Sequence, residues 1–293
     1  MERTIIYYHR HWLPGKTIEC ILEPQVLHIC LMRRIHSLKI VLKPSIYDDF
    51  MHSELPAALV PMSKVPLSQD KLLTHLRQTI DYGRQMAEDM DAGIEVRNVS
   101  MDDNPEVDSQ NAYIGKIHSN TLTYILNTYI STHLRYAVLY LLWLHPLISQ
   151  FTSAVMLASV PLPYGYYEFY KKRKRIKNKC REYGYYTFEH TLRELVIILH
   201  AIKKCLTFGT EKGLINMEEG SIFSNLATLF SIPCKDVKEI LDLHSQFSGL
   251  KRYCIKVNNE YNVVSLKPPF LSGDTVSVNG FGGTYFSKLF EWF

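Results

Sequence analysis

The stretch from Ser53 to Gln78 constrains the fold of this chain more than any other. Its apolar run Ala57–Val60 predicts a short strand, which a proline-containing turn separates from a second short strand at Lys64–Leu67. The proline inside the second strand favours a sheet edge, because proline cannot donate a ladder hydrogen bond. Polar residues 68–70 then open a helix with apolar residues at helical spacing. The stretch therefore predicts the order strand, turn, strand, helix.

Pro56 lies directly before the first of these strands. A proline in this position has no N–H to give to a ladder and often marks a tight bend. A cis Leu55–Pro56 bond would suit such a bend, although only a small minority of bonds before proline are cis. The sequence leaves the isomer open and marks Pro56 as a structural residue.

The residues before this stretch predict a strand, a helix and a further strand. Thr4–Tyr8 is β-branched and aromatic, which is typical of a strand. Glu23–His36 carries apolar residues every four positions, and its proline stands where a first helical turn tolerates one. Leu38–Leu42 predicts the second strand. Residues 1–82 are therefore expected to form an α/β domain in the order βαβ followed by ββα.

The rest of the chain predicts helices. Residues 83–115 are polar and acidic and predict a linker, with one helix near Tyr82–Met90. Residues 116–262 predict a helical domain, in which an Asn216-x-x-Glu219 capping box opens one helix. Residues 263–293 form an aromatic and glycine-rich tail. The expected helices of the domain are Ser119–Leu134, Tyr136–Ile148, Gln150–Ala158, Glu168–Arg181, Thr187–Leu206, Asn216–Phe230, Val237–His244 and Phe247–Glu260.

The most apolar stretch of the chain is Tyr136–Pro161. A membrane-spanning helix needs about 20 apolar residues. His145 and Pro146 interrupt this stretch midway, and polar residues follow them. A buried helix pair is therefore expected here rather than a membrane span.

This order of elements resembles the glutathione-transferase superfamily, in which a thioredoxin-like domain with a cis-proline loop precedes a helical domain. Within that superfamily, Leu55-Pro56-Ala57 and the run Leu72-Leu73-Thr74-His75-Leu76-Arg77 look most like the metaxins, transferase-related proteins of the mitochondrial outer membrane. Trp143 and the turn Pro161-Leu162-Pro163 resemble further metaxin features. The resemblance covers roughly residues 4–262. It implies a thioredoxin-like N-terminal domain followed by a glutathione-transferase-type helical domain.

A working transferase needs a group just after the first strand that lowers the pKa of the substrate thiol. The candidates in this chain are Tyr7, Tyr8, His9, His11 and Cys20. The family also needs a Glu/Gln-Ser pair at a helix start to hold the peptide. Gln69 fits this pair, but Asp70 replaces the serine and would repel the carboxylate that it should bind. The glutathione site therefore reads as degraded, and no enzymatic activity is expected.

Composition predicts a globular chain without a metal or a bound cofactor. The formal net charge is +4, with 46% hydrophobic and 21% charged residues. The six cysteines form no CxxC pair, the twelve histidines form no HExxH motif, and no glycine-rich phosphate loop lies between a strand and a helix. The first residues resemble neither a signal peptide nor a matrix presequence. Cytosol, or the outer face of an organelle, is the expected location.

Two segments are candidate interaction surfaces. Eight of the eleven residues 171–181 are Lys or Arg, and tyrosines lie just before them, a combination that suits an anionic membrane surface or an acidic partner. A solvated helix face is the alternative, and no fold motif supports a nucleic-acid partner. The aromatic tail is expected to dock on a partner or to strap down on the protein itself. The residues assigned to these surfaces are Lys171, Lys172, Arg173, Lys174, Arg175, Phe286, Phe290 and Trp292.

The resemblance implies a non-enzymatic subunit of a mitochondrial outer-membrane complex that sorts and imports β-barrel proteins. The chain would lie peripherally on the cytosolic face, together with a second metaxin-like subunit and a β-barrel insertase. One alternative is an active glutathione transferase, with Tyr8 activating the thiol and Gln69 on the peptide. The other is a metaxin-like accessory subunit of a different mitochondrial complex.

Overall fold

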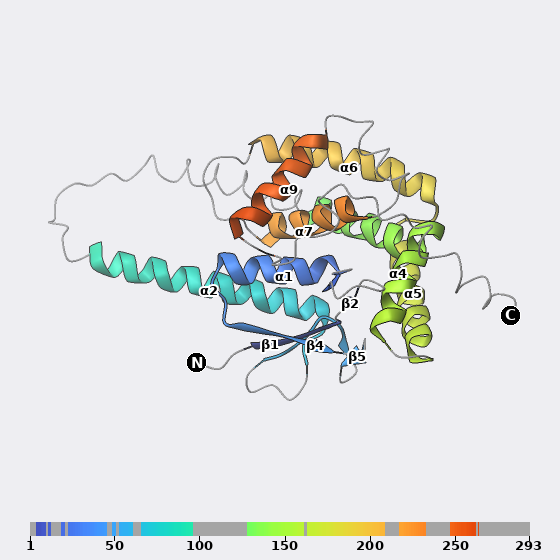
Figure 1. Ribbon diagram of the computed structural model, residues 1–293. Helices are drawn as coiled ribbons and strands as arrows, with labels where there is room; N and C mark the ends of the chain where they lie inside the picture. The colour runs from blue at the N-terminus through green and yellow to red at the C-terminus, as the bar shows by residue number, and fades with distance from the viewer. Residues whose placement is uncertain are drawn as a thin grey trace, which may run out of the picture.

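The chain begins with a small sheet and continues as helices (Figure 1). The structure is a computed structural model that describes residues 4–9, 11–12, 19–20, 23–45, 49–50, 53–60, 66–95, 128–160, 163–208, 217–232, 247–261 and 263. The prediction of an α/β N-terminal part followed by helices is confirmed at this level.

Strand β1 (Thr4–His9) lies at the centre of a three-stranded sheet of order β4-β1-β7. It runs parallel to β4 (Ile40–Ser45) and antiparallel to β7 (Ala57–Leu59). Ile6 in β1 is fully buried. Pro44 within β4 is tolerated because β4 is the outer strand of this order, where one set of backbone groups has no ladder to join.

Two further pairs of very short strands flank the sheet. β2 (His11–Trp12) pairs with β3 (Glu19–Cys20), and β5 (Asp49–Phe50) pairs with β6 (Ser53–Glu54), both antiparallel. Neither pair could be predicted from the sequence, because two-residue strands are too short to show an alternation pattern.

The Leu55–Pro56 bond is cis, and both residues are buried. The bond lies between β6 and β7, at the bend that the sequence predicts. Of the second predicted strand, Pro66 and Leu67 lie within the described residues. Leu67 exchanges two backbone hydrogen bonds with Ala58, of 2.8 and 3.1 Å, so this position does join the edge of the sheet.

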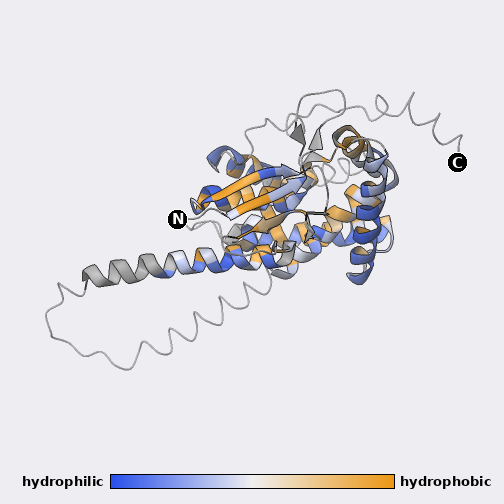
Figure 2. Cartoon of the chain, turned by 90° about the horizontal axis from the view of Figure 1, so that it is seen from below, coloured by the Kyte–Doolittle hydropathy of each residue, from blue (hydrophilic) through white to orange (hydrophobic). Residues whose placement is uncertain are grey.

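Helices α1 (Pro24–Ile35) and α2 (Gln69–Glu95) lie on the same side of the sheet (Figures 1 and 2). Ile29 and Leu72 belong to the same buried apolar cluster as the centre of β1. α2 is one continuous helix, so the helix predicted near Tyr82–Met90 is its second half rather than a separate element in a linker.

The second half of the described chain is helical. Figure 1 places α6 and α9 above α7, with α7 beside α1, and α4 and α5 together beyond the strands β2 and β5. α7 packs against both α1 and α9. One helix before α4 has no label and spans Thr128–Leu144. The labelled helices are α4 (Pro146–Ser159), α5 (Tyr164–Glu182), α6 (Phe188–Phe208), α7 (Met217–Ser231) and α9 (Ser248–Tyr261).

His145 and Pro146 break the apolar stretch where the sequence predicts. Pro146 occupies the first position of α4, and the His145 ring accepts a hydrogen bond of 3.4 Å from the backbone N–H of Ile148. The bend between the two helices is 76°. The predicted break before Tyr136 is wrong, because the helix that precedes it continues to Leu144 without interruption.

No single helix among those described combines the length and apolar character of a membrane span. Among the described helices, only the bent pair Thr128–Leu144 and Ile148–Ala158, taken together, has a length and an apolar composition that would suit a membrane span.

An ion pair links the N-terminal and helical parts. Arg77 of α2 pairs with Glu218 at the start of α7, where the carboxylate also suits the positive end of the helix dipole. Glu219 follows it and is half-buried, whereas Asn216 of the predicted capping box lies outside the described residues.

Replacing Gly220 by alanine is expected to lower the free energy of unfolding by about 1–2 kcal/mol. A Cβ on Gly220 would lie 2.4 Å from Met32 Cε and 3.0 Å from His28 Cδ2, so α1 and α7 would have to separate or repack. Gly83→Ala is the matched control. Its Cβ meets nothing within 4 Å, and alanine there should gain up to about 1 kcal/mol from helix propensity. Urea unfolding measures both, and an equal or higher stability of Gly220→Ala would contradict the close packing.

Candidate functional site

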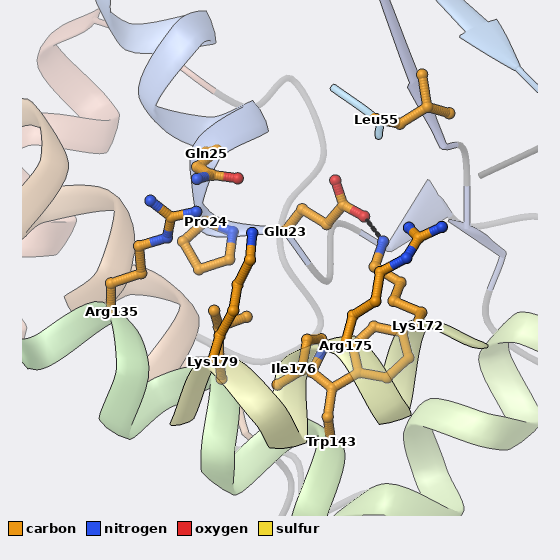
Figure 3. Close-up of a pocket in the computed structure, with 11 residues that line it drawn as sticks. Glu23, Pro24, Gln25, Leu55, Arg135, Trp143, Lys172, Arg175, Ile176 and Lys179 are labelled. Atoms are coloured by element: carbon orange, nitrogen blue, oxygen red, sulfur yellow. Dashed lines mark hydrogen bonds and ion pairs between the residues drawn. The ribbon is translucent and has the colours of Figure 1, made fainter. Parts of the chain in front are cut away.

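A small cavity lies where the N-terminal and helical parts of the chain meet (Figure 3). Its volume is about 50 Å³. The first turn of α1 and Leu55 of the cis-proline bend form one side, while α5 and the helix Thr128–Leu144 form the other. The residues that line it are Glu23, Pro24, Gln25, Leu55, Arg135, Leu139, Trp143, Lys172, Arg175, Ile176 and Lys179.

A buried ion pair crosses this cavity. Lys172 Nζ of α5 contacts Glu23 Oε1, directly before α1, and the two side chains are only 11% and 7% exposed. The same ammonium lies 5.2 Å from the centre of the Trp143 ring, on which Phe169 stacks at 5.7 Å. The ion pair therefore lies between the start of α1 and the Trp143 ring, where water is largely excluded.

Positive charge predominates around the cavity. Figure 3 shows Arg135 and Lys179 extending toward Pro24 and Gln25 at the start of α1. Arg175 lies beside Lys172 in the same view. Together with the positive end of the α1 dipole, these four basic side chains face one carboxylate, that of Glu23, among the residues that line the cavity.

Trp143 adds a buried hydrogen-bond donor to this site. The residue is fully buried, and its Nε1 makes no hydrogen bond with any described group. An indole N–H can only donate, and a buried donor without an acceptor costs about 1–3 kcal/mol. One residue of the cavity wall therefore contains a buried donor that has no acceptor among the described groups.

Of the predicted thiol activators, the three whose side chains the structure describes do not line this cavity. Tyr7 and Tyr8 are half-buried in β1, and His9 is buried at its end, but none of the three lines the cavity. The side chains of His11, Cys20, Gln69 and Asp70 lie outside the described residues, although α2 does begin at Gln69.

Two buried cysteines, Cys180 and Cys254, are not suited to nucleophilic chemistry. Burial raises the pKa of Cys180 to about 12 and also raises the pKa of Cys254 well above its usual range. A thiol with a raised pKa is protonated and inert at neutral pH. No group of three or more potential metal ligands occurs among the residues that the structure describes.

The basic residues between 171 and 181 are divided between the two faces of α5. The buried face of α5 consists of Gly165, Glu168, Lys172, Ile176 and Cys180. The prediction that Lys172 belongs to the outer surface is therefore wrong. Its spacing of four from Glu168 and Ile176 places it on the packed side, where Glu23 balances its charge. Arg175 is half-buried and faces the cavity.

The outer side of α5 carries tyrosines and basic residues, as predicted. Tyr167 and Tyr170 are 59% and 67% exposed, and Tyr164 and Tyr166 are exposed as well. Lys171 Nζ lies 5.9 Å from the centre of the Tyr167 ring. We call the outer α5 surface the set Tyr164, Tyr166, Tyr167, Tyr170, Lys171, Arg173, Lys174, Lys177 and Arg181. The predicted tail residues Phe286, Phe290 and Trp292 lie outside the described residues.

Leu55, Trp143, Lys172 and Arg175 were singled out in the sequence for other roles, but the cavity that they form with Glu23 and Arg135 was not predicted. Arg135, Leu139 and Trp143 repeat every four residues, and so line one face of their helix. Lys172, Arg175 and Lys179 show the corresponding spacing on α5. Both patterns are visible in the sequence. Each taken alone is typical of a helix face that carries both apolar and charged residues, and only the fold places the two faces together beside Glu23.

No protein-family model matches this chain, and neither does any curated protein.

Proposed function

We propose that this chain is a non-catalytic, metaxin-like subunit of a mitochondrial outer-membrane complex that sorts and imports β-barrel proteins. The observation that carries the non-catalytic part is the Glu23–Lys172 pair in the cleft beside the cis-proline bend. In the transferase-type fold that the sequence resembles, glutathione would be held beside the cis-proline loop. The order of elements, with a cis-proline ahead of β7 and helices after α2, supports that comparison.

The dimensions of the cleft argue against a bound tripeptide. Sites for ligands of that size have volumes of about 300–1,000 Å³. The cavity here measures about 50 Å³, since Lys172 and Trp143 fill the space between α5 and α1. Admitting glutathione would require the buried ion pair to open, which is costly. The proposed role is therefore to bind other proteins and a membrane surface, not to conjugate thiols.

Two measurements test this function. Glutathione should neither bind in calorimetry nor support conjugation of a chromogenic electrophile. The full-length chain, expressed with an affinity tag, should purify with a β-barrel insertase from the mitochondrial outer membrane. Saturable glutathione binding with turnover would overturn the non-catalytic role. Recovery with the subunits of a respiratory complex or ATP synthase instead would support the accessory-subunit alternative.

Binding to anionic vesicles should depend on the outer α5 surface. Replacing Lys174 and Lys177 by glutamine is expected to weaken binding by about 2 kcal/mol, or roughly 30-fold, because each basic side chain near an anionic membrane contributes about 1 kcal/mol. The exposed tyrosines should keep a residual affinity, since their rings suit the headgroup layer. Co-sedimentation with phosphatidylcholine vesicles, with and without phosphatidylserine, measures the effect.

The matched control for this experiment is Lys203→Gln with Lys204→Gln. Both lysines are exposed on α6, so this variant loses the same charge from another helix. It should bind as the unmodified protein does. Equal weakening of both variants would show that only net charge matters, and that the outer α5 surface has no specific role.

A further inference from the structure

Aromatic side chains gather where the helix that precedes α4 meets the connection between α5 and α6. The ring of His133 lies at the centre of this group. Its centroid is 4.2 Å from that of Tyr129 and 6.4 Å from that of Tyr183. The Tyr185 ring lies 6.2 Å from it, and Tyr136 stacks on Tyr183 at 3.9 Å. We call these five residues the aromatic cluster.

A tight turn at the end of α5 holds the tyrosines of the connection in place. Gly184, directly after the C-cap residue, has a φ of 87°, which glycine adopts without strain. Its N–H donates to the carbonyl of Arg181 at 3.1 Å, and the N–H of Tyr185 donates to that of Cys180 at 2.9 Å. This is the Schellman pattern of a firmly closed helix end. The Tyr185 hydroxyl in turn donates to the His133 carbonyl at 3.0 Å, so the cluster is fixed from two sides.

The aromatic cluster is buried on its inner side and open on its outer side. Tyr136 and Tyr185 are buried, whereas Tyr129 and Tyr183 are 58% and 42% exposed. Tyr136 covers one face of the Tyr183 ring, so the exposed area of Tyr183 belongs to its other face and its edge. His133 contacts both exposed rings and is half-buried. Ring faces held open in this way attract cations, because their electron density makes them negative.

A carboxylate on α6 adds negative charge beside the aromatic cluster. Glu194 lies one helical turn after His190, whose ring is 6.5 Å from that of Tyr185. Burial lowers the pKa of His133, and the charge of Glu194 opposes this shift, so the carboxylate acts on the centre of the cluster. Glu194 forms no ion pair within the part of the chain that the structure describes. A carboxylate beside uncharged rings favours a positively charged ligand.

We propose that the outer side of the aromatic cluster binds a quaternary ammonium group, such as the choline of a phosphatidylcholine headgroup. Aromatic rings are the usual recognition elements for this group, whose methyl groups pack on ring faces while the cation is attracted to them. A primary ammonium is strongly hydrated and gains less from such a surface. The ligand is either a lipid headgroup or a small free molecule with the same group. This site rests on its own observations and does not depend on the proposed function.

The experiment is a titration of the full-length protein, followed by saturation-transfer NMR, with choline as the ligand. We expect saturable binding with a roughly millimolar dissociation constant. Tyr129→Leu and Glu194→Gln should each weaken it about twofold to fivefold, the effect of losing one contact at an exposed cation site. Tyr129→Phe keeps the ring and should keep the affinity. Ethanolamine, the primary ammonium analogue of choline, should bind several-fold more weakly.

The matched controls remove the same groups elsewhere. Tyr82→Leu removes an exposed tyrosine from α2, and Glu189→Gln removes an exposed carboxylate from α6. Both should bind choline as the unmodified protein does. Melting temperatures measured without ligand show which variants are folded, and Tyr129→Leu alone suffices for the test because Tyr129 lies at the surface.

A water-soluble short-chain phosphatidylcholine, kept below its micelle concentration, distinguishes the source of the ligand. Tighter binding of this lipid than of choline would support a headgroup site, and equal affinities would support a site for a free quaternary ammonium. Absence of saturable choline binding would overturn the proposal. Equal affinity for ethanolamine would overturn it too, because the surface would then attract any small cation, and so would an equal loss of binding in the control variants.

Discussion

Replacing Glu23 by glutamine is expected to lower the free energy of unfolding by about 3–5 kcal/mol, the range found when one partner of a buried ion pair is removed. The Glu23 and Lys172 side chains are 7% and 11% exposed, so water cannot compensate for the lost partner. The cost should be large here because the described lining of the cavity would then include four basic side chains and no carboxylate. Urea unfolding at neutral pH measures it.

Lys172→Met should cost less than Glu23→Gln. Methionine keeps most of the packing against Trp143, and Arg175 remains in the cavity to balance Glu23. The double variant should be more stable than the sum of the two single effects predicts, because neither charge is then left alone. Strict additivity in this cycle would mean that the two residues do not interact.

The Arg77–Glu218 pair provides the comparison for this prediction. It also joins the N-terminal part to the helices, but the Arg77 side chain is 42% exposed. Exposed pairs contribute about 0–1 kcal/mol, so Arg77→Gln should have a small effect. A loss as large as that of Glu23→Gln would show that burial is not what separates the two pairs.

Local patterns were sufficient to predict most of the described elements. β1, α1, β7 and the opening of α2 follow from short-range signals, namely β-branched runs, spacing of four residues and a proline at a strand start. The break at His145–Pro146 followed for the same reason, because proline disrupts a helix wherever it stands in the interior. The length of α2 was not predicted, since Gly83 and the acidic residues beyond it are typical of a helix end.

The cavity could not be predicted because its residues come from four segments that are distant in sequence. The buried face of α5 could not be recognised in the sequence because it contains the charged residues Glu168 and Lys172. A run of charged residues usually marks a solvated face. Glu23, the partner of Lys172, shows nothing in the sequence beyond its position directly before the proline that begins a helix. Charge compensation between such positions depends on the tertiary fold, which no local pattern encodes.

Lowering the pH from 7 to 5 should lower the free energy of unfolding by about 2 kcal/mol through His28 alone, and by about 3 kcal/mol at pH 4. His28 of α1 is buried against α7, and burial lowers its pKa from 6.5 to about 4. A hydrogen bond to the Met217 backbone raises this pKa and only partly offsets burial, whereas the charges of Arg135 and Arg77 lower it further. The folded state therefore disfavours the imidazolium.

The direction of the pH effect follows from which state binds the proton. Above pH 6.5 the imidazole is neutral in both states, so His28 contributes no pH dependence there. Between pH 6.5 and 4 the unfolded chain takes up a proton that the folded chain does not, and stability falls as the pH falls. Below pH 4 both states are protonated, and the loss from this residue reaches its limit.

The test compares urea unfolding of the unmodified protein and His28→Gln at pH 7, 6 and 5. Glutamine is uncharged throughout this range, so the variant should lose less stability on acidification, by about 2 kcal/mol at pH 5, even if it starts lower at pH 7. His190→Gln is the matched control, because it removes an exposed histidine from α6. If His28→Gln and the unmodified protein lose stability in parallel, the His28 imidazole is not held neutral between α1 and α7.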